Sequence, residues 1–260
     1  MSVIKLIVEE VQHLKSQPDS YQRPANLSLK HRLLMPEIID DPALAPSIFV
    51  EELAALERIN WWSRSAGILW PSIKCLARRV SPKPVRVLDI ATGGGDVPIA
   101  LWNRARRYGV ALQIDGCDVK PLAVEYASRK AASAGASSEF FRCDAIEEPL
   151  PSGYDLIMCS LFFHHLSDAA ALRFLGNMAE AAQHTVCIND LLRNRRGLAL
   201  AYGGSFLLTR SAETHADAPQ SVRAAFTLEE VAQLADKAGL HNYRLARRWP
   251  CRFLFEWNRS

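Results

Sequence analysis

The sequence predicts an α/β protein whose core is a doubly wound, mostly parallel β-sheet. From residue 85 onward, short apolar segments typical of strands alternate with longer segments whose apolar residues recur at helical spacing. Such alternation favours a parallel sheet with helices on both faces. The segments before it are helical or turn-rich. We therefore predict an N-terminal helical cap or lid over residues 1–80 and an α/β core over residues 81–260, with a lid insertion at about residues 191–225.

The cap is expected to contain several helices separated by turns. Residues 1–16 have an amphipathic helical pattern, and the Pro- and Ser-rich stretch that follows is interpreted as a linker. Prolines divide residues 35–47 into two short helical pieces. Apolar residues at helical spacing then predict helices within residues 47–80.

The core begins with five predicted strands, which cover residues 85–91, 111–119, 138–145, 154–161 and 184–192. Helices are expected between them over residues 98–108, 121–134 and 168–182. A last helix opens with Thr227 and Glu230 at capping-box spacing and closes at Gly239, where a left-handed residue is favoured. Two adjacent strands joined by a tight turn at Pro250 then form an antiparallel hairpin at one edge of the sheet.

The lid insertion has an apolar first half and a polar second half. The first half predicts a helix with a bend at Gly203 and Gly204, and the stretch "THADAPQSVRAAF" predicts a structured loop that faces the ligand pocket. Within this region, Arg193, His215 and Arg223 are candidate anchors for an anionic group of a substrate. The alternative is that they are ordinary surface charges.

Composition excludes several classes of protein. A net charge of +3 is too small to indicate nucleic-acid binding, and the six cysteines show no C-x-x-C pair, which favours reduced thiols and no metal site. No apolar run approaches the roughly 18 residues that span a bilayer, so no stable membrane insertion is expected. The N-terminus lacks a signal-peptide pattern, and we predict a cytoplasmic location.

The glycine-rich segment "LDIATGGGD", residues 88–96, follows the first predicted strand and is typical of a loop that approaches a ligand closely. A phosphate-binding P-loop would need Gly-Lys-Ser/Thr, which is absent. In the dinucleotide fingerprint, Pro98 would occupy the third glycine position, which calls for Gly or Ala. Pro98 instead suits the first turn of a helix.

The segment resembles the cofactor motif of class I S-adenosylmethionine-dependent methyltransferases. This resemblance implies a Rossmann-like, seven-stranded fold, with S-adenosyl-L-methionine as cofactor and S-adenosyl-L-homocysteine as product. It assigns the acidic position of the motif to Asp89, a ribose contact to Asp118 and a contact with the adenine amino group to Asp144. Ala91 departs from the commonest glycine pattern. The remaining cofactor-binding candidates are Thr92, Gly93, Gly95, Val119, Ala145 and Ser160.

The segment "FFHHL" after the fourth strand resembles quinone-biosynthesis methyltransferases and natural-product O-methyltransferases. His164 or His165 is therefore a candidate general base for a phenol, because imidazole titrates near neutral pH. Asp190, at the end of the fifth strand, is a candidate to orient that histidine or bind substrate. Trp61 and its neighbour Trp62 are expected to close over the cofactor, with Trp61 as a candidate substrate contact, although core or lid packing is the alternative. Two motifs are absent: the one for methylation of amino groups on bases or amides, and the Pro-Cys pair for attack on a pyrimidine.

These features predict methyl transfer to an oxygen of a lipophilic aromatic small molecule, such as a polyketide-derived phenol or a resorcylic acid. C-methylation of a quinol in quinone biosynthesis and a non-catalytic scaffold that binds the cofactor remain as alternatives. The expected assembly is a monomer or a homodimer.

Overall fold

The computed structural model describes residues 28–41, 43–209 and 211–259, and its centre is a seven-stranded sheet of order β3-β2-β1-β4-β5-β7-β6. The first five strands run parallel, and β7 is antiparallel to both β5 and β6. This confirms the predicted fold class and the antiparallel C-terminal hairpin. The strands are β1 (Val85–Ile90), β2 (Leu112–Asp118), β3 (Phe140–Arg142), β4 (Tyr154–Ser160), β5 (Ala182–Leu191), β6 (Arg244–Arg248) and β7 (Arg252–Asn258).

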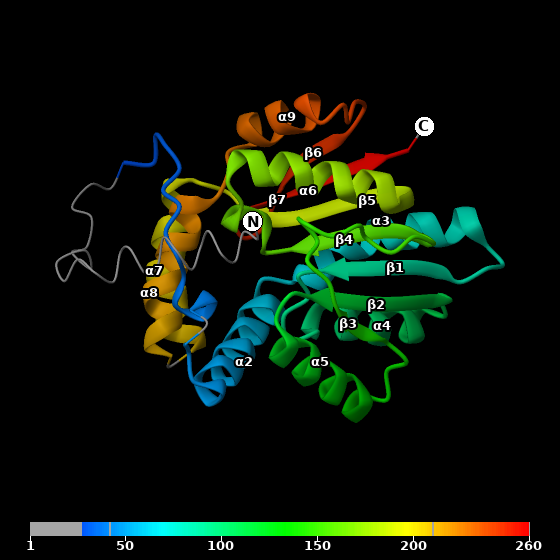
Figure 1. Ribbon diagram of the computed structural model, residues 1–260, viewed down its shortest axis with the longest axis horizontal. Helices are drawn as coiled ribbons and strands as arrows, with labels where there is room; N and C mark the ends of the chain where they lie inside the picture. The colour runs from blue at the N-terminus through cyan, green and yellow to red at the C-terminus, as the bar shows by residue number, and fades with distance from the viewer. Residues whose placement is uncertain (1–27, 42, 210, 260) are drawn as a thin grey trace.

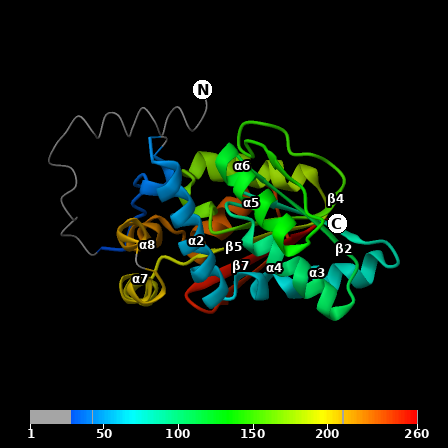
Figure 2. The same cartoon turned by 90° about the horizontal axis from the view of Figure 1, so that it is seen from below.

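Helices cover both faces of the sheet (Figures 1 and 2). On one face, α3 (Ser65–Val80) and α4 (Asp96–Tyr108) share a buried apolar cluster with β1 and β4, and α5 (Pro121–Ala134) packs beside β3. On the other face, α6 (Asp168–Ala181) and α9 (Leu228–Lys237) enclose a second cluster. Burial from both sides explains why the central strands are apolar without alternation.

Local sequence signals fix most helix boundaries. The side chain of Ser167 accepts from the backbone N–H of Ala170 at the start of α6, and Thr227 and Glu230 form the predicted capping box of α9. Gly239 has a φ of 74°, as expected after a helix. The predicted third strand is longer than β3. This strand lies at the edge of the sheet and pairs only with β2.

The described part of the cap consists of a short 3₁₀ helix η1 (Ile38–Asp40), α2 (Pro46–Trp62) and α3. The two helices within residues 47–80 were predicted correctly. The amphipathic segment 1–16 and most of the following linker lie outside the described residues.

The lid region differs from its prediction in two respects. α7 (Arg195–Leu208) runs through Gly203 and Gly204 as one continuous helix, so the two glycines do not break it. The predicted loop is mostly a helix, α8 (Ala212–Ala224), which packs against α7 and is capped by the Ser211 side chain. Pro219 lies inside α8. Packing against α7 and the 3₁₀ helix η2 (Phe163–His165) therefore outweighs the turn preference of this Pro-containing segment.

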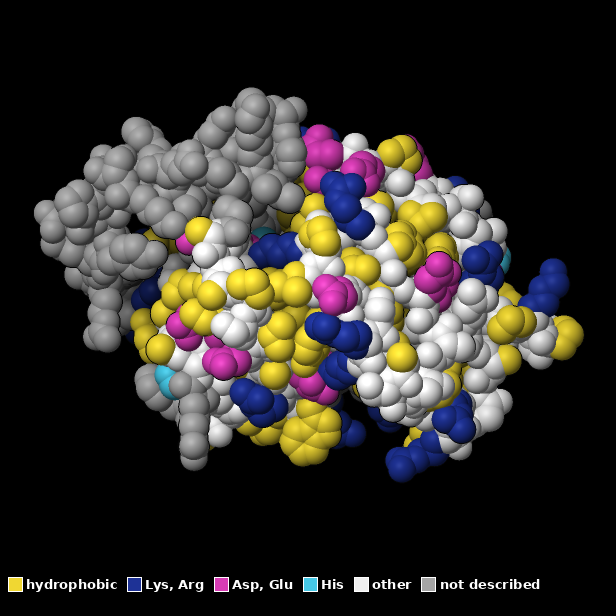
Figure 3. Space-filling model, turned by 60° about the horizontal axis from the view of Figure 1, so that its bottom comes forward, with side chains coloured by type: hydrophobic (Ala, Val, Ile, Leu, Met, Phe, Trp, Pro, Cys, Tyr) yellow, Lys and Arg dark blue, Asp and Glu magenta, His cyan; other side chains and the backbone are white. Residues whose placement is uncertain are grey.

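The α7–α8 pair lies beside α2, at the end of the sheet where the parallel strands terminate (Figures 1 and 2). On the face drawn in Figure 3, hydrophobic side chains gather over this half of the molecule, with Lys and Arg side chains next to them. None of the helices among the described residues has the length and apolar character needed to cross a bilayer.

Candidate active site

The glycine loop joins β1 to α4, and Asp89 at the end of β1 stabilises it through a hydrogen bond with Thr92. The Thr92 hydroxyl donates a 2.8 Å hydrogen bond to Asp89 Oδ2, while Oδ1 has no partner among the described residues. Burial raises the pKa of Asp89 to about 8. Ala91 and Gly93 adopt positive φ angles of 53° and 52°, so the turn keeps its left-handed geometry although alanine replaces a glycine. Asp89 thus supports the loop from behind.

Gly95 ends the loop in a position that excludes a side chain. Its φ is 70°, and a Cβ there would lie 2.9 Å from Cβ of Ala127 and 3.0 Å from the ring of Phe140. α4 begins directly afterwards at Asp96, so its N-terminus faces the loop. The glycine therefore permits close packing of α4 against α5 and β3.

Asp118 and Asp144 lie at the carboxyl ends of β2 and β3, next to this loop. Asp118 Oδ2 accepts the backbone N–H of Gly93 at 2.9 Å, and Oδ1 accepts that of Lys120 at 3.0 Å. Asp144 Oδ1 accepts the backbone N–H of Ile146 at 3.1 Å. Burial raises the pKa of Asp118, although these hydrogen bonds oppose that effect. Both carboxyl groups line the same cavity.

This cavity has a volume of about 630 Å³ and extends from the glycine loop to the lid helices. Its walls come from the strand ends, from α2 and from the α7–α8 pair, so segments far apart in the sequence meet here. Most lining side chains are apolar, which suits a hydrophobic ligand. They include Phe49, Leu53, Leu56, Ile59, Trp62, Phe162, Leu200 and Leu208.

A hydrogen-bonded histidine lies at the polar end of the cavity. His164 Nδ1 is 2.7 Å from Asp190 Oδ1, and the backbone N–H of His164 donates to Oδ2 at 3.1 Å. Burial alone raises the pKa of Asp190, but the contacts with His164 outweigh it and the pKa is lowered. An ionised Asp190 requires the proton on Nδ1, so in the neutral tautomer of this geometry the lone pair is on Nε2.

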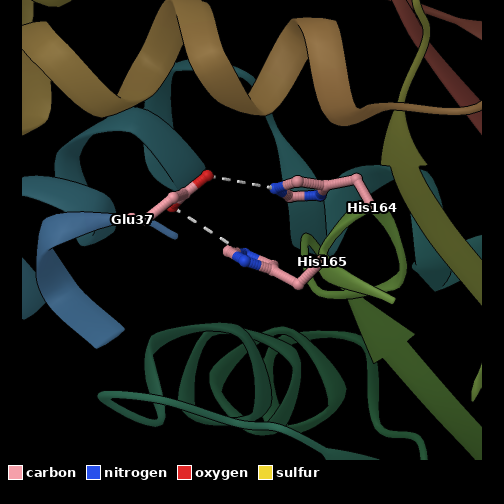
Figure 4. A group of neighbouring side chains, drawn as sticks. All are labelled: Glu37, His164 and His165. Carbon is pink, nitrogen blue, oxygen red and sulfur yellow. Dashed lines mark ion pairs between the residues drawn. The ribbon is translucent and has the colours of Figure 1, made fainter. Parts of the chain in front are cut away.

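His165 lies beside His164 in a different electrostatic setting. Both rings point toward Glu37 (Figure 4), with the His164 and His165 Nε2 atoms 3.8 Å and 3.9 Å from its carboxylate oxygens. Asp40 Oδ2 lies 3.5 Å from His165 Nδ1. Burial lowers the pKa of His165, but Glu37 and Asp40 together raise it to about 10. His165 is therefore protonated at neutral pH.

Comparison with known proteins identifies the central part of the chain. Residues 87–184, which include the glycine loop, both acids and the two histidines, match the family described as "Methyltransferase domain". The chain contains a class I S-adenosylmethionine-dependent methyltransferase domain. The strand order described above and the antiparallel hairpin agree with this assignment.

Three individual matches illustrate the similarity. Two proteins named demethylmenaquinone methyltransferase are each 34% identical to this chain over part of its length. The match with the protein from Deinococcus radiodurans covers 108 residues, or 41% of this chain, and the match with the protein from Thermus thermophilus covers 86 residues, or 33%. The matched region spans 39% and 37% of these relatives. The structure of magnesium protoporphyrin IX methyltransferase from Synechocystis PCC 6803 has a TM-score of 0.53 at 17% identity, and the match covers 75% of this chain and 84% of that one.

The residues around the glycine loop fit the S-adenosylmethionine cofactor of this domain. Positive φ angles open the loop, and a Cβ at Gly93 would project toward Leu53 at 3.6 Å, on the cavity side. The carboxylate of Asp118 suits ribose hydroxyls, and Asp144 lies farther along the same wall. Ten of the predicted site residues line the cavity: Ala91, Thr92, Gly93, Asp118, Val119, Asp144, Ala145, Ser160, His164 and His165.

The predicted substrate anchors do not lie on the cavity of the methyltransferase domain. The Arg193 guanidinium pairs with Glu230 at 2.6 Å, and that of Arg223 donates to the Tyr202 hydroxyl at 3.1 Å. His215 Nε2 is 3.0 Å from the carbonyl oxygen of Thr209. Each of these groups thus has a protein partner away from the cavity, although Arg223 Nε has none among the described residues.

Trp61 and Trp62 separate because they point to different sides of α2. The side chain of Trp61 is 81% exposed, whereas Trp62 lines the cavity. The substrate contact predicted for Trp61 is therefore available to Trp62 instead. Asp190 and Gly95 do not line the cavity. Asp190 contacts His164, and Gly95 allows the close packing at the end of the loop.

Many polar residues of the cavity were not predicted, among them Glu37, Asp40, Asp217 and Arg252. Glu37 and Asp40 belong to the segment "MPEIIDDP", whose acids resemble an ordinary exposed turn. Asp217 Oδ1 has no partner among the described residues, and burial together with Glu37 raises its pKa to about 8. No local sequence signal distinguishes these side chains from surface charges.

Proposed function

We propose that the protein transfers a methyl group from S-adenosylmethionine to an oxygen of a lipophilic aromatic small molecule. The observation that carries the proposal is the continuity of one largely apolar cavity from the glycine loop to the His164–Asp190 pair. Its apolar walls suit an aromatic ring with alkyl substituents, and its polar end suits a hydroxyl group.

The chain's own residues supply orientation and a base. The bound cofactor contributes an electrophilic methyl group on a sulfonium, so the remaining task is to hold the acceptor oxygen in line and remove its proton. With Nδ1–H held by Asp190, Nε2 of His164 accepts the proton of a phenol. Leu200 and Leu208 of α7 add apolar surface to the wall of the same space.

His165 has a separate role in this proposal. Its ring centroid lies 4.2 Å from that of His164, and its acidic neighbours keep it positively charged. A positive imidazolium beside the base stabilises the phenolate oxygen that forms when His164 takes the proton. Only His164 is then free to act as the base.

C-methylation of a quinol is the second candidate, and the two relatives named demethylmenaquinone methyltransferase favour it. A quinol is also a phenol, and removal of its hydroxyl proton raises the electron density at the neighbouring ring carbon. The same His164 therefore serves either outcome. The position of the acceptor relative to the methyl group decides which atom is methylated.

The experiment is methyl transfer from S-adenosylmethionine with a labelled methyl group to alkyl phenols, resorcylic acids and quinols. Each labelled product is then treated with mild base. A product that is stable to base and is identified as an aryl methyl ether supports the O-methylation of a phenol. Release of labelled methanol by base indicates a methyl ester. A methyl carbon attached to the ring by NMR supports the quinol candidate.

The non-catalytic alternative is tested in parallel by isothermal titration with S-adenosylhomocysteine. Binding without transfer to any acceptor of the panel would contradict the proposed acceptor class. Absence of binding would contradict the enzymatic proposal itself.

A further inference from the structure

Arg252 is a buried cation on the wall of the cavity. It is the first residue of β7 and pairs with Leu191 of β5, which places it at the edge of the sheet where the parallel strands end. It is only 2% exposed, yet it is among the lining residues. Among the described residues it is one of the largest side chains that are fully buried.

The guanidinium of Arg252 has hydroxyl partners but forms no ion pair with any residue in the described part of the chain. One of its nitrogens donates to Ser65 Oγ, and another donates to Ser63 Oγ at 2.6 Å. Burial lowers the pKa of Arg252 to about 10, with Asp190 and Asp96 acting against this from a distance, so it remains charged at neutral pH. By contrast, the buried Arg193 pairs directly with Glu230. Charges inside proteins are usually paired.

A helix N-terminus and polar side chains lie next to Arg252. Ser65 begins α3, so the positive end of that helix lies at the same place. The neighbouring Ser63 and Asn60 also line the cavity, and Asn60 accepts from the Ser65 hydroxyl at 2.7 Å. Two acids act on Arg252: Asp190, which is engaged by His164, and Asp96, which also lines the cavity. This corner therefore presents a cation, a helix N-terminus and hydroxyl groups to the cavity.

We propose that Arg252, together with Ser63 and the N-terminus of α3, is a binding site for a carboxylate. Carboxylate is the anion whose two oxygens match the fork of a guanidinium. Two sources supply it: the amino-acid end of the cofactor, or a carboxyl group on an aromatic acceptor. The proposal rests on the methyltransferase assignment, and the first source is favoured because Arg252 lines the same cavity as the glycine loop.

The test compares ligands that differ only in the carboxylate. Isothermal titration measures the affinity of wild type, Arg252→Lys and Arg252→Gln for S-adenosylhomocysteine and for its decarboxylated analogue. If Arg252 binds the cofactor carboxylate, Arg252→Gln weakens S-adenosylhomocysteine binding by about 10- to 100-fold, as expected for a charged hydrogen-bonded contact. Its affinity for the decarboxylated analogue stays within about twofold, and Arg252→Lys shows a smaller loss.

A second arm tests the acceptor as the source. With S-adenosylhomocysteine saturating, the titrated probes are 2,4-dihydroxy-6-pentylbenzoate and the corresponding 5-pentylresorcinol. Selective loss of affinity for the benzoate in Arg252→Gln assigns the carboxylate to the acceptor. None of these measurements depends on turnover, so failure of the proposed methyl transfer leaves the test of Arg252 intact.

Thermal unfolding separates a binding role from a structural one. Arg252→Gln loses the hydrogen bonds to Ser63 and Ser65 but also removes a buried charge that has no ion-pair partner among the described residues, so its ligand-free melting temperature is expected to stay within a few degrees of wild type. Equal affinities of wild type and Arg252→Gln for all four ligands would overturn the proposal. So would a parallel loss of affinity for the ligands with and without a carboxylate.

Discussion

Replacement of Asp190 by asparagine tests how the structure activates His164. Asp190 is 1% exposed and does not line the cavity, so it acts through His164 as a positioning residue. Its carboxylate accepts from His164 Nδ1, from the His164 backbone and from the Leu191 backbone N–H at 2.6 Å. In an asparagine of the same shape, an NH₂ group at the Oδ1 position faces Nδ1 and loses the bond from the Leu191 N–H, while the carbonyl oxygen at Oδ2 keeps the bond from the His164 backbone.

The amide then reverses the tautomer of His164. Nδ1 must accept instead of donate, so the proton moves to Nε2 and the base is lost. General-base catalysis contributes about 10²- to 10⁴-fold. The expected loss in single-turnover rate is therefore in that range, or roughly 3–5 kcal/mol of transition-state stabilisation.

The assay is single-turnover transfer of a labelled methyl group to the best phenolic acceptor, with the affinity for S-adenosylhomocysteine measured alongside. Asp115→Asn is a matched control, because Asp115 is 3% exposed and accepts from Glu139 N–H and the Tyr154 hydroxyl away from the cavity. A rate for Asp190→Asn within threefold of wild type, at unchanged cofactor affinity, would refute the assignment of His164 as base. An equal loss in Asp115→Asn would show that fold stability is being measured.

Gly95→Ala combines a positive φ with a steric clash, so we expect it to lower the free energy of unfolding in chemical denaturation by about 2–4 kcal/mol. Gly109→Ala has a positive φ but open space around the new Cβ, and it should lower the same free energy by about 1 kcal/mol. Equal losses in the two variants would refute the packing argument. His165 has its pKa raised to about 10 in the folded state, so its stabilising contribution is complete below pH 6.5 and is lost as pH rises toward 10. Wild type should therefore lose at least about 1.4 kcal/mol more stability than His165→Gln between pH 6.5 and 10, and identical pH profiles would contradict the ion pair. Trp62→Ala should raise the KM of the acceptor about 10-fold and Trp61→Ala should leave it unchanged, since only Trp62 lines the cavity; equal effects on KM would contradict this placement.

Local signals were sufficient for most of the core. The spacing of apolar residues predicted the strands and the helix over residues 121–134, which coincides with α5. Residues 214–226 were harder, because Pro219 and small polar residues favour turns locally. Helix α8 forms there because it packs against α7 and is capped by Ser211. Without that packing, the sequence does not distinguish a helix that contains Pro219 from a turn.

By itself the sequence determined the fold class, the glycine loop and the acids at the ends of neighbouring strands, because these depend on short spacings and on which strand each residue follows. Only the tertiary structure decided which charged side chains reach the cavity. Arg193 has the same charge as Arg252, yet the first pairs with Glu230 and the second lines the cavity. Likewise, Glu37 lies more than 120 positions before His164 in the chain and becomes its neighbour only in the folded protein. The ionisation of each group depends on burial and on partners distant in sequence, and these arise only from packing.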